Sequence, residues 1–134
     1  MKKDIDFRLV EDIGIAIVLD SEEPNQRNWK VYLLNFKSET ITDILVSSKG
    51  YGTLQNEQVQ TSLFRHSLGN LLPNEFKAIE LIDESLFAIT NEFWLSFYIN
   101  NTIFDKKFIF LPETVIDSNL IQIPIIHKLG VLIR

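Results

Sequence analysis

The chain of 134 residues contains no cysteine. Disulfide frameworks, cysteine-based zinc sites and thiol nucleophiles are therefore excluded. With 46% hydrophobic residues, the chain has enough apolar material for a core that needs no cross-links. Histidine is also scarce, since only His66 and His127 are present, and they lie far apart in the sequence. The sequence therefore predicts neither a metal site nor a cofactor.

Positive charge is not in excess. Acidic residues outnumber basic ones by 18 to 13, and the net charge is −5. Nucleic-acid-binding proteins usually present a clustered basic face, so we expect no nucleic-acid partner. No apolar run reaches the roughly 18 residues that a membrane span requires. The opening residues, MKKDIDFRLV, are charged where a secretory leader would be apolar, and we expect a cytoplasmic protein that does not contact membranes.

Glycine and proline are few, with five and four copies. Together with Asn, Ser and Asp they form short polar segments that interrupt the apolar runs of the chain. The apolar runs between these segments are too short for most helices and suit strands. Ten phenylalanines add to this preference, because aromatic residues favour pleated, half-buried surfaces. The sequence predicts seven strands, over residues 10–19, 29–36, 41–48, 59–66, 76–82, 92–100 and 102–111. The Asn100-Asn101 pair predicts a tight hairpin between the last two, because asparagine tolerates positive φ.

Seven short strands with regular turn signals predict an all-β fold with one domain, residues 1–134. We interpret it as an immunoglobulin-like or fibronectin-type-III-like β-sandwich of seven to eight strands, with a barrel as the alternative. Residues 112–134 form an apolar tail that must be packed, either as an edge strand or over an open sheet edge.

Side chains that point alternately to the two faces of the strand over residues 92–100 predict a surface site. If residues 93, 95, 97 and 99 face the core, Trp94 and Tyr98 lie on the opposite face. Either the tail covers these two side chains, or they form an exposed aromatic patch that binds another protein or a second copy of the chain. Together with Trp29 they are the candidate interface residues, because exposed aromatic side chains are frequent interface anchors.

The segment SSKGYG, residues 47–52, superficially suggests a phosphate-binding loop. A P-loop requires a lysine after the second glycine and a following helix, and both are missing here. We interpret Gly50 and Gly52 as turn residues between two strands. A hairpin there would bring Lys49 and Tyr51 close to Arg65 and His66, which predicts a small basic site for a carboxylate or phosphate.

Six segments carry a resemblance to a known family, and they span almost the whole chain in order. They are WKVYLLN (29–35), SSKGYG (47–52), RHSLGNLLPN (65–74), NEFWLSFY (91–98), DKKFIF (105–110) and GVLI (130–133). These segments resemble a family of short bacterial proteins that often carry the label phenylalanyl-tRNA synthetase subunit. The resemblance implies an auxiliary role beside that synthetase.

Catalysis by the chain itself is not indicated. A class II synthetase core needs a large sheet and two arginine-bearing motifs, whereas this chain offers only Phe64-Arg65-His66, and no arginine follows Gly52. The acidic pairs fall in predicted turns, and no Ser-His-Asp arrangement is present. We therefore expect a non-enzymatic interaction module that binds a protein partner or self-associates. The alternatives are an anion-binding protein that uses Lys49, Tyr51, Arg65 and His66, and the auxiliary synthetase role.

Overall fold

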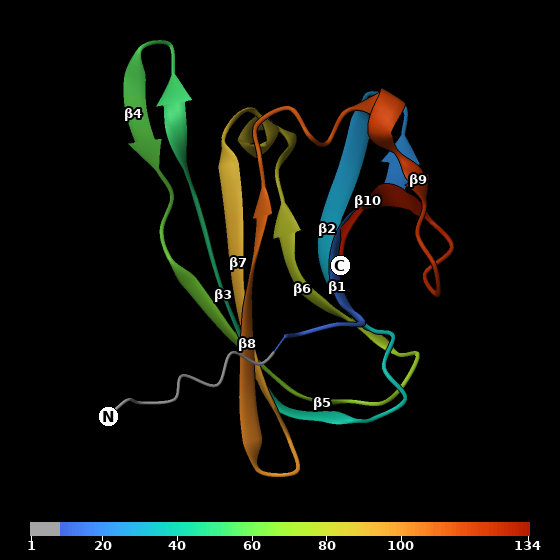
Figure 1. Cartoon of the computed structure of the whole chain (residues 1–134). Coiled ribbons are helices and arrows are strands. Elements are labelled where there is room, and N and C mark those ends of the chain that lie inside the picture. Colours follow the sequence, from blue (N-terminus) through green and yellow to red (C-terminus); the bar gives the residue numbers. More distant parts are fainter. Residues whose placement is uncertain (1–8) are drawn as a thin grey trace.

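The computed structural model describes residues 9–134, so that most of the charged opening segment lies outside the described residues. Two antiparallel sheets pack face to face (Figure 1). The first sheet contains, in spatial order, β6 (Phe76–Ile82), β2 (Gln26–Asn35), β1 (Ile13–Glu23), β10 (Leu129–Ile133) and β9 (Ile121–Gln122). The second contains β4 (Glu57–Gln60), β3 (Ile41–Leu54), β7 (Thr90–Ile99) and β8 (Thr102–Phe110), with β5 (Phe64–Leu71) also paired to β3. Nearly all regular structure is strand, as the sequence predicts.

The orders β6-β2-β1 and β3-β7-β8 match strands E-B-A and C-F-G of an immunoglobulin-like sandwich, whereas β5 pairs with β3 and does not lie beyond β6. The chain forms β1 and β2 in the first sheet, crosses to the second sheet with β3 to β5, returns with β6 beside β2, and crosses again with β7 beside β3. Strand β8 then pairs with β7, and the C-terminal strands extend the first sheet beyond β1. The all-β sandwich is therefore confirmed.

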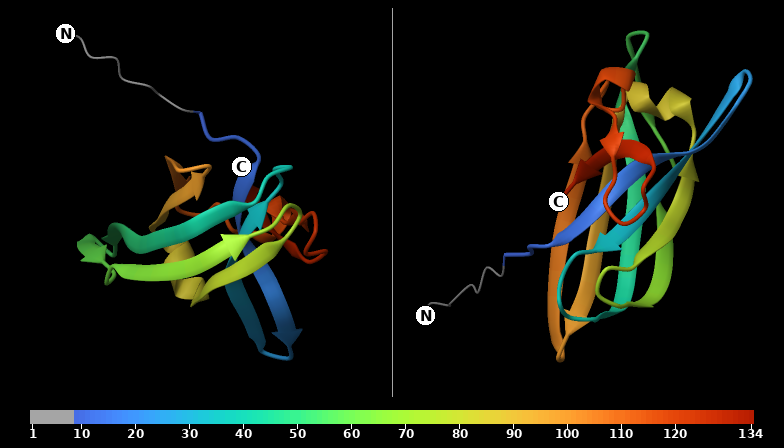
Figure 2. Two further views of the ribbon diagram at one scale, coloured as in Figure 1. Left: turned by 90° about the horizontal axis from the view of Figure 1, so that it is seen from below. Right: turned by 90° about the vertical axis from the view of Figure 1, so that its right-hand side faces the viewer.

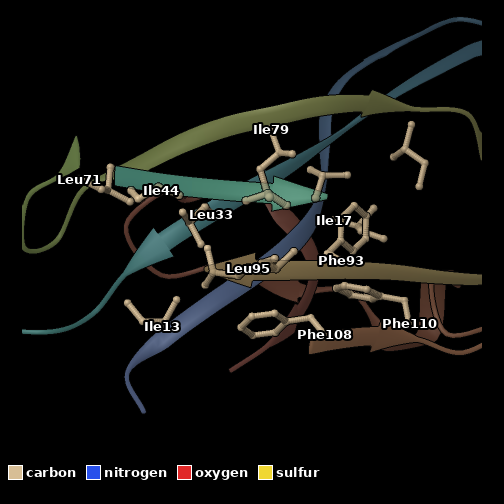
Figure 3. Close-up of a cluster of buried hydrophobic side chains, with 14 of the residues drawn as sticks. Ile13, Ile17, Leu33, Ile44, Leu71, Ile79, Phe93, Leu95, Phe108 and Phe110 are labelled. Atoms are coloured by element: carbon tan, nitrogen blue, oxygen red, sulfur yellow. The ribbon is translucent and has the colours of Figure 1, made fainter. Parts of the chain in front are cut away.

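The core lies between the two sheets (Figure 3). On β7, Phe93, Leu95 and Phe97 are almost fully buried, and they face Ile17 and Leu33 of the first sheet. Each such side chain contributes about 1.5–3 kcal/mol by leaving water. The predicted inward face of residues 93, 95 and 97 is thus confirmed, which fixes the opposite side of β7 as the outward face.

The C-terminal tail has two structural roles. Its strand β10 pairs with β1 and adds to the first sheet, as expected. Before β10, the chain folds over the outer side of that sheet and buries Ile123 completely against Ala16, Val18 and Leu34. Both sides of the β1–β2 centre are therefore covered, while the outer side of the second sheet receives nothing from the tail.

The largest departure from the predicted elements concerns the two glycines of SSKGYG. They do not form a turn: β3 continues through both and ends at Leu54, and the turn lies at Gln55 and Asn56, whose φ angles are 51° and 67°. Packing disfavours a larger residue at Gly50, since a Cβ there would lie 3.1 Å from side-chain atoms of Ile89 and Thr61. The strand expected over residues 59–66 is accordingly two strands, β4 and β5, separated by residues 61–63.

Two hairpin turns and two 3₁₀ turns lie at the ends of the strands. The predicted Asn100–Asn101 hairpin is confirmed, with φ angles of 48° and 64°. The β1–β2 hairpin is longer than expected and turns at Pro24 and Asn25, so that its tip projects beyond the body of the sandwich (Figure 2). Two 3₁₀ turns complete the structure, η1 (Glu84–Ala88) and η2 (Asp117–Asn119). Among residues 9–134, no helix has the length and apolarity to cross a membrane.

Candidate functional site

The outer side of the second sheet carries the exposed aromatic residues. We call it the outer face, and it is formed by outward-pointing side chains of β3, β5, β7 and β8. Trp94 is 48% exposed and Tyr98 is 37% exposed. The tail packs on the other sheet, so the expectation that it covers these two residues is wrong. A tryptophan exposed to this extent on a sheet face keeps about half of its surface in contact with water, and that surface is available to a partner.

Cations lie on both sides of Trp94. The strand register places Lys107 opposite it on β8 and Ser47 opposite it on β3, and Arg65 follows on β5, opposite Ser47. Lys107 Nζ lies 4.7 Å from the centroid of the indole ring, which is within the range of a cation–π contact. No carboxylate of the described residues forms an ion pair with Arg65 or Lys107.

A shallow pocket of about 260 Å³ lies between Trp94 and Arg65. Leu45 contributes an apolar wall, and Ser47 and Ser96 contribute hydroxyl groups. The pocket therefore offers a planar aromatic surface, a guanidinium fork and small hydrogen-bonding groups. Arginine binds carboxylate and phosphate groups through two parallel hydrogen bonds, so a ligand that combines an anion with an apolar group matches this lining. The structure thus brings together one residue from each predicted site.

Lys49 and Tyr51 lie on the same outer face but already have a partner. Lys49 Nζ lies 3.8 Å from Glu92 Oε2, and the Tyr51 hydroxyl donates a hydrogen bond of 3.1 Å to Glu92 Oε1. Burial raises the pKa of Tyr51, and the hydrogen bond to Glu92 raises it further. Glu92 is not among the site residues predicted from the sequence, and the β3–β7 register places it directly opposite Lys49. The charge of Lys49 is therefore largely compensated within the protein.

His66 does not belong to this surface. It pairs with the buried Val46, so its side chain points inward, opposite to that of its neighbour Arg65. Its Nε2 lies 2.7 Å from Glu80 Oε1 on β6, and it thereby connects the edges of the two sheets. The four residues of the predicted anion site are thus not brought together, because successive residues of a strand point to opposite faces.

Trp29 is likewise absent from the outer face. It is 4% exposed and packs edge-on against Phe87, with 5.1 Å between ring centroids. Its indole N–H donates a 2.9 Å hydrogen bond to Glu84 Oε1, and the Arg27 guanidinium lies 5.1 Å above its ring. The structure therefore places Trp29 in the core, and a direct interface contact would need it exposed. Trp94, Tyr98 and Arg65 remain as the candidate site.

Among residues 9–134, no group of three or more histidine and acidic side chains could hold a metal ion. Comparison of the chain with protein-family models, with curated proteins and with solved structures finds no match. The resemblance to the proteins labelled as synthetase subunits accordingly stays a hypothesis.

Proposed function

We propose that this protein is a non-enzymatic interaction module whose outer face binds an acidic segment of a protein partner. The observation that carries the proposal is the exposed Trp94, which lies between Arg65 and Lys107 on a sheet face that no other part of the described chain covers. Large aromatic and arginine side chains are the residue types that contribute most to binding energy at protein interfaces.

Charge complementarity favours an acidic partner. The chain as a whole carries a net charge of −5, yet two cations that lack a carboxylate partner in the described residues flank the exposed ring of Trp94. Glu92 does not compensate them, because it is bound to Lys49 and Tyr51, and Asp105 on β8 forms no ion pair with any described residue. An acidic segment with one apolar side chain would pair with Arg65 and cover Trp94.

A second copy of the chain fits this surface less well. Two copies related by a two-fold axis would place the same patch on both sides of the interface. Arg65 and Lys107 of one copy would then face Lys107 and Arg65 of the other, and juxtaposed like charges cost several kcal/mol. We therefore expect the protein to sediment as a monomer over a wide concentration range, and a dimer that dissociates on Trp94→Ala would identify a second copy as the occupant instead.

Peptide-library selection tests the proposal without a known partner. We expect the wild-type protein to enrich peptides in which Asp or Glu lies near an aromatic or aliphatic residue. Trp94→Ala should weaken binding of the enriched peptides about 30-fold, since hot-spot residues contribute about 2 kcal/mol or more. Leu72→Ala is a matched control, because Leu72 is 52% exposed and lies in the β5–β6 turn, off the outer face.

Arg65→Ala should weaken binding and remove the preference for acidic residues, whereas Lys37→Ala, in the β2–β3 connection, should change neither. The proposal is wrong if no peptides are enriched, if those enriched lack acidic residues, or if they bind Trp94→Ala and wild type equally. We place the module in the cytoplasm, in keeping with its lack of cysteine.

A further inference from the structure

A second cavity lies inside the sandwich, away from the outer face. It has a volume of about 100 Å³ and opens where β3, β6 and η1 approach one another. Phe64, Leu86 and Phe93 form apolar walls, while Ser48 and Glu80 place polar groups in the lining. Ligand pockets for drug-sized molecules are about 300–1,000 Å³, so this cavity suits only a short chemical group.

The carboxylate of Glu80 is held in one orientation. Its Oε1 accepts a 2.7 Å hydrogen bond from Ser48 Oγ, and His66 Nε2 lies 2.7 Å from the same oxygen. Among residues 9–134, no group donates a hydrogen bond to Oε2. The carboxylate is thus oriented by two neighbours that bind one of its oxygens, while the other oxygen keeps its capacity to accept hydrogen bonds.

The charge of Glu80 has no lysine or arginine partner among the described residues. Lys49 belongs to the lining of the cavity, but its ammonium group lies 3.8 Å from Glu92 on the outer face. The Glu80 side chain is 20% exposed, so its charge is only partly hydrated. A partly desolvated carboxylate attracts a cation more strongly than one in water does.

We propose that this cavity binds an alkylammonium group. The ammonium would donate to Glu80 Oε2 and to a lone pair of Ser48 Oγ, and its alkyl chain would lie against Leu86 and the two phenylalanine rings. Phenylalanine faces attract cations, and aliphatic stems pack on apolar walls while the charged end reaches a polar group. The group can come from a small primary amine or from a lysine side chain of another protein, since both present the same chemistry.

Titration with n-butylamine, followed by NMR, tests the proposal. At pH 8 an alkylamine stays protonated, and butylammonium should produce saturable shifts of the amide signals of Ser48, Phe64 and Glu80. Two probes with the same alkyl chain are the controls: butyrate should produce no saturable shift, and n-butanol should bind at least tenfold more weakly. This comparison uses the wild-type protein alone, so it does not depend on any variant folding.

Glu80→Gln keeps the shape of the side chain and removes its charge, and it should weaken butylamine binding at least tenfold. Glu57→Gln makes the same chemical change at an exposed position in β4 and should have no effect. A short peptide with one lysine distinguishes the two sources: binding comparable to butylamine indicates a protein lysine, and tenfold weaker binding indicates a small amine. The proposal is overturned if butylamine does not saturate, if butanol binds equally well, or if a folded Glu80→Gln variant retains full affinity.

Discussion

The two tryptophans of this chain should respond in opposite ways to the same substitution. Trp29 is 4% exposed, whereas Trp94 is 48% exposed on the outer face. Replacing a buried tryptophan by alanine costs about 3–5 kcal/mol, through lost burial and the cavity that remains. Trp29→Ala also removes the edge-on contact with Phe87 and the hydrogen bond to Glu84, so we expect a loss of about 4 kcal/mol.

Trp94→Ala should cost no more than about 1 kcal/mol. The residue already exposes about half of its surface to water, and the cation–π contact with Lys107 is worth about 0.5–1 kcal/mol at an exposed site. For a chain of this length, 1 kcal/mol corresponds to a Tm change of about 3–4 °C. We therefore expect Tm to fall by roughly 12–16 °C for Trp29→Ala and by no more than about 4 °C for Trp94→Ala.

Thermal and urea unfolding followed by circular dichroism would measure both changes. A Trp29→Phe variant is the intermediate control, because it keeps an aromatic ring against Phe87 and loses the indole N–H together with part of the ring volume. Equal losses of unfolding free energy for the two alanine variants would refute the assignment of Trp94 to the surface. A larger loss for Trp94→Ala would place Trp94 in the core and Trp29 on the surface.

Three further predictions concern the scaffold. Ile123→Ala should destabilise the protein by about 2–4 kcal/mol, measured by urea unfolding, because the fully buried Ile123 holds the tail on the first sheet; an unchanged midpoint would show that the tail is not packed there. Hydrogen bonds from Lys128, Tyr32 and Lys30 lower the pKa of Asp20 to about 2. The folded state therefore gains up to about 2 kcal/mol of stability, which is present above the unfolded pKa of 3.8 and is lost as pH falls towards 2. Relative to Asp20→Asn, the wild type should lose this stability between about pH 5 and 2, and parallel curves of stability against pH for the two proteins would contradict the prediction. Gly50→Ala should lower the free energy of unfolding by about 1–3 kcal/mol, since the added Cβ meets packed side chains, and a neutral effect would contradict the tight packing at this glycine.

The alternation of apolar residues was sufficient to predict the sandwich and the orientation of β7. It predicted that Trp94 and Tyr98 oppose the core, because a strand has a period of two whatever its partners are. The same rule separates Arg65 from His66, whose side chains must point to opposite faces of one strand. Grouping them into a single anion site was therefore wrong on local grounds alone.

Other features depend on contacts between distant segments. Glu92 lies opposite Lys49 only because β3 extends beyond Ser48, whereas the glycines that follow are typical of a turn. The burial of Trp29 depends on η1, which brings Phe87 beneath its ring from far along the chain. Local propensity cannot specify such pairings, because the packing of other elements decides them.

The binding role of the outer face is tested most directly by the indole N–H signals of the protein. The chain has two tryptophans and therefore two such signals, one from the surface and one from the core. When a library-selected acidic peptide is added to the labelled protein, we expect the Trp94 signal to shift and saturate while the Trp29 signal stays in place. A shift of the Trp29 signal alone, or of neither signal during saturable binding, would contradict the assignment of the outer face as the binding surface.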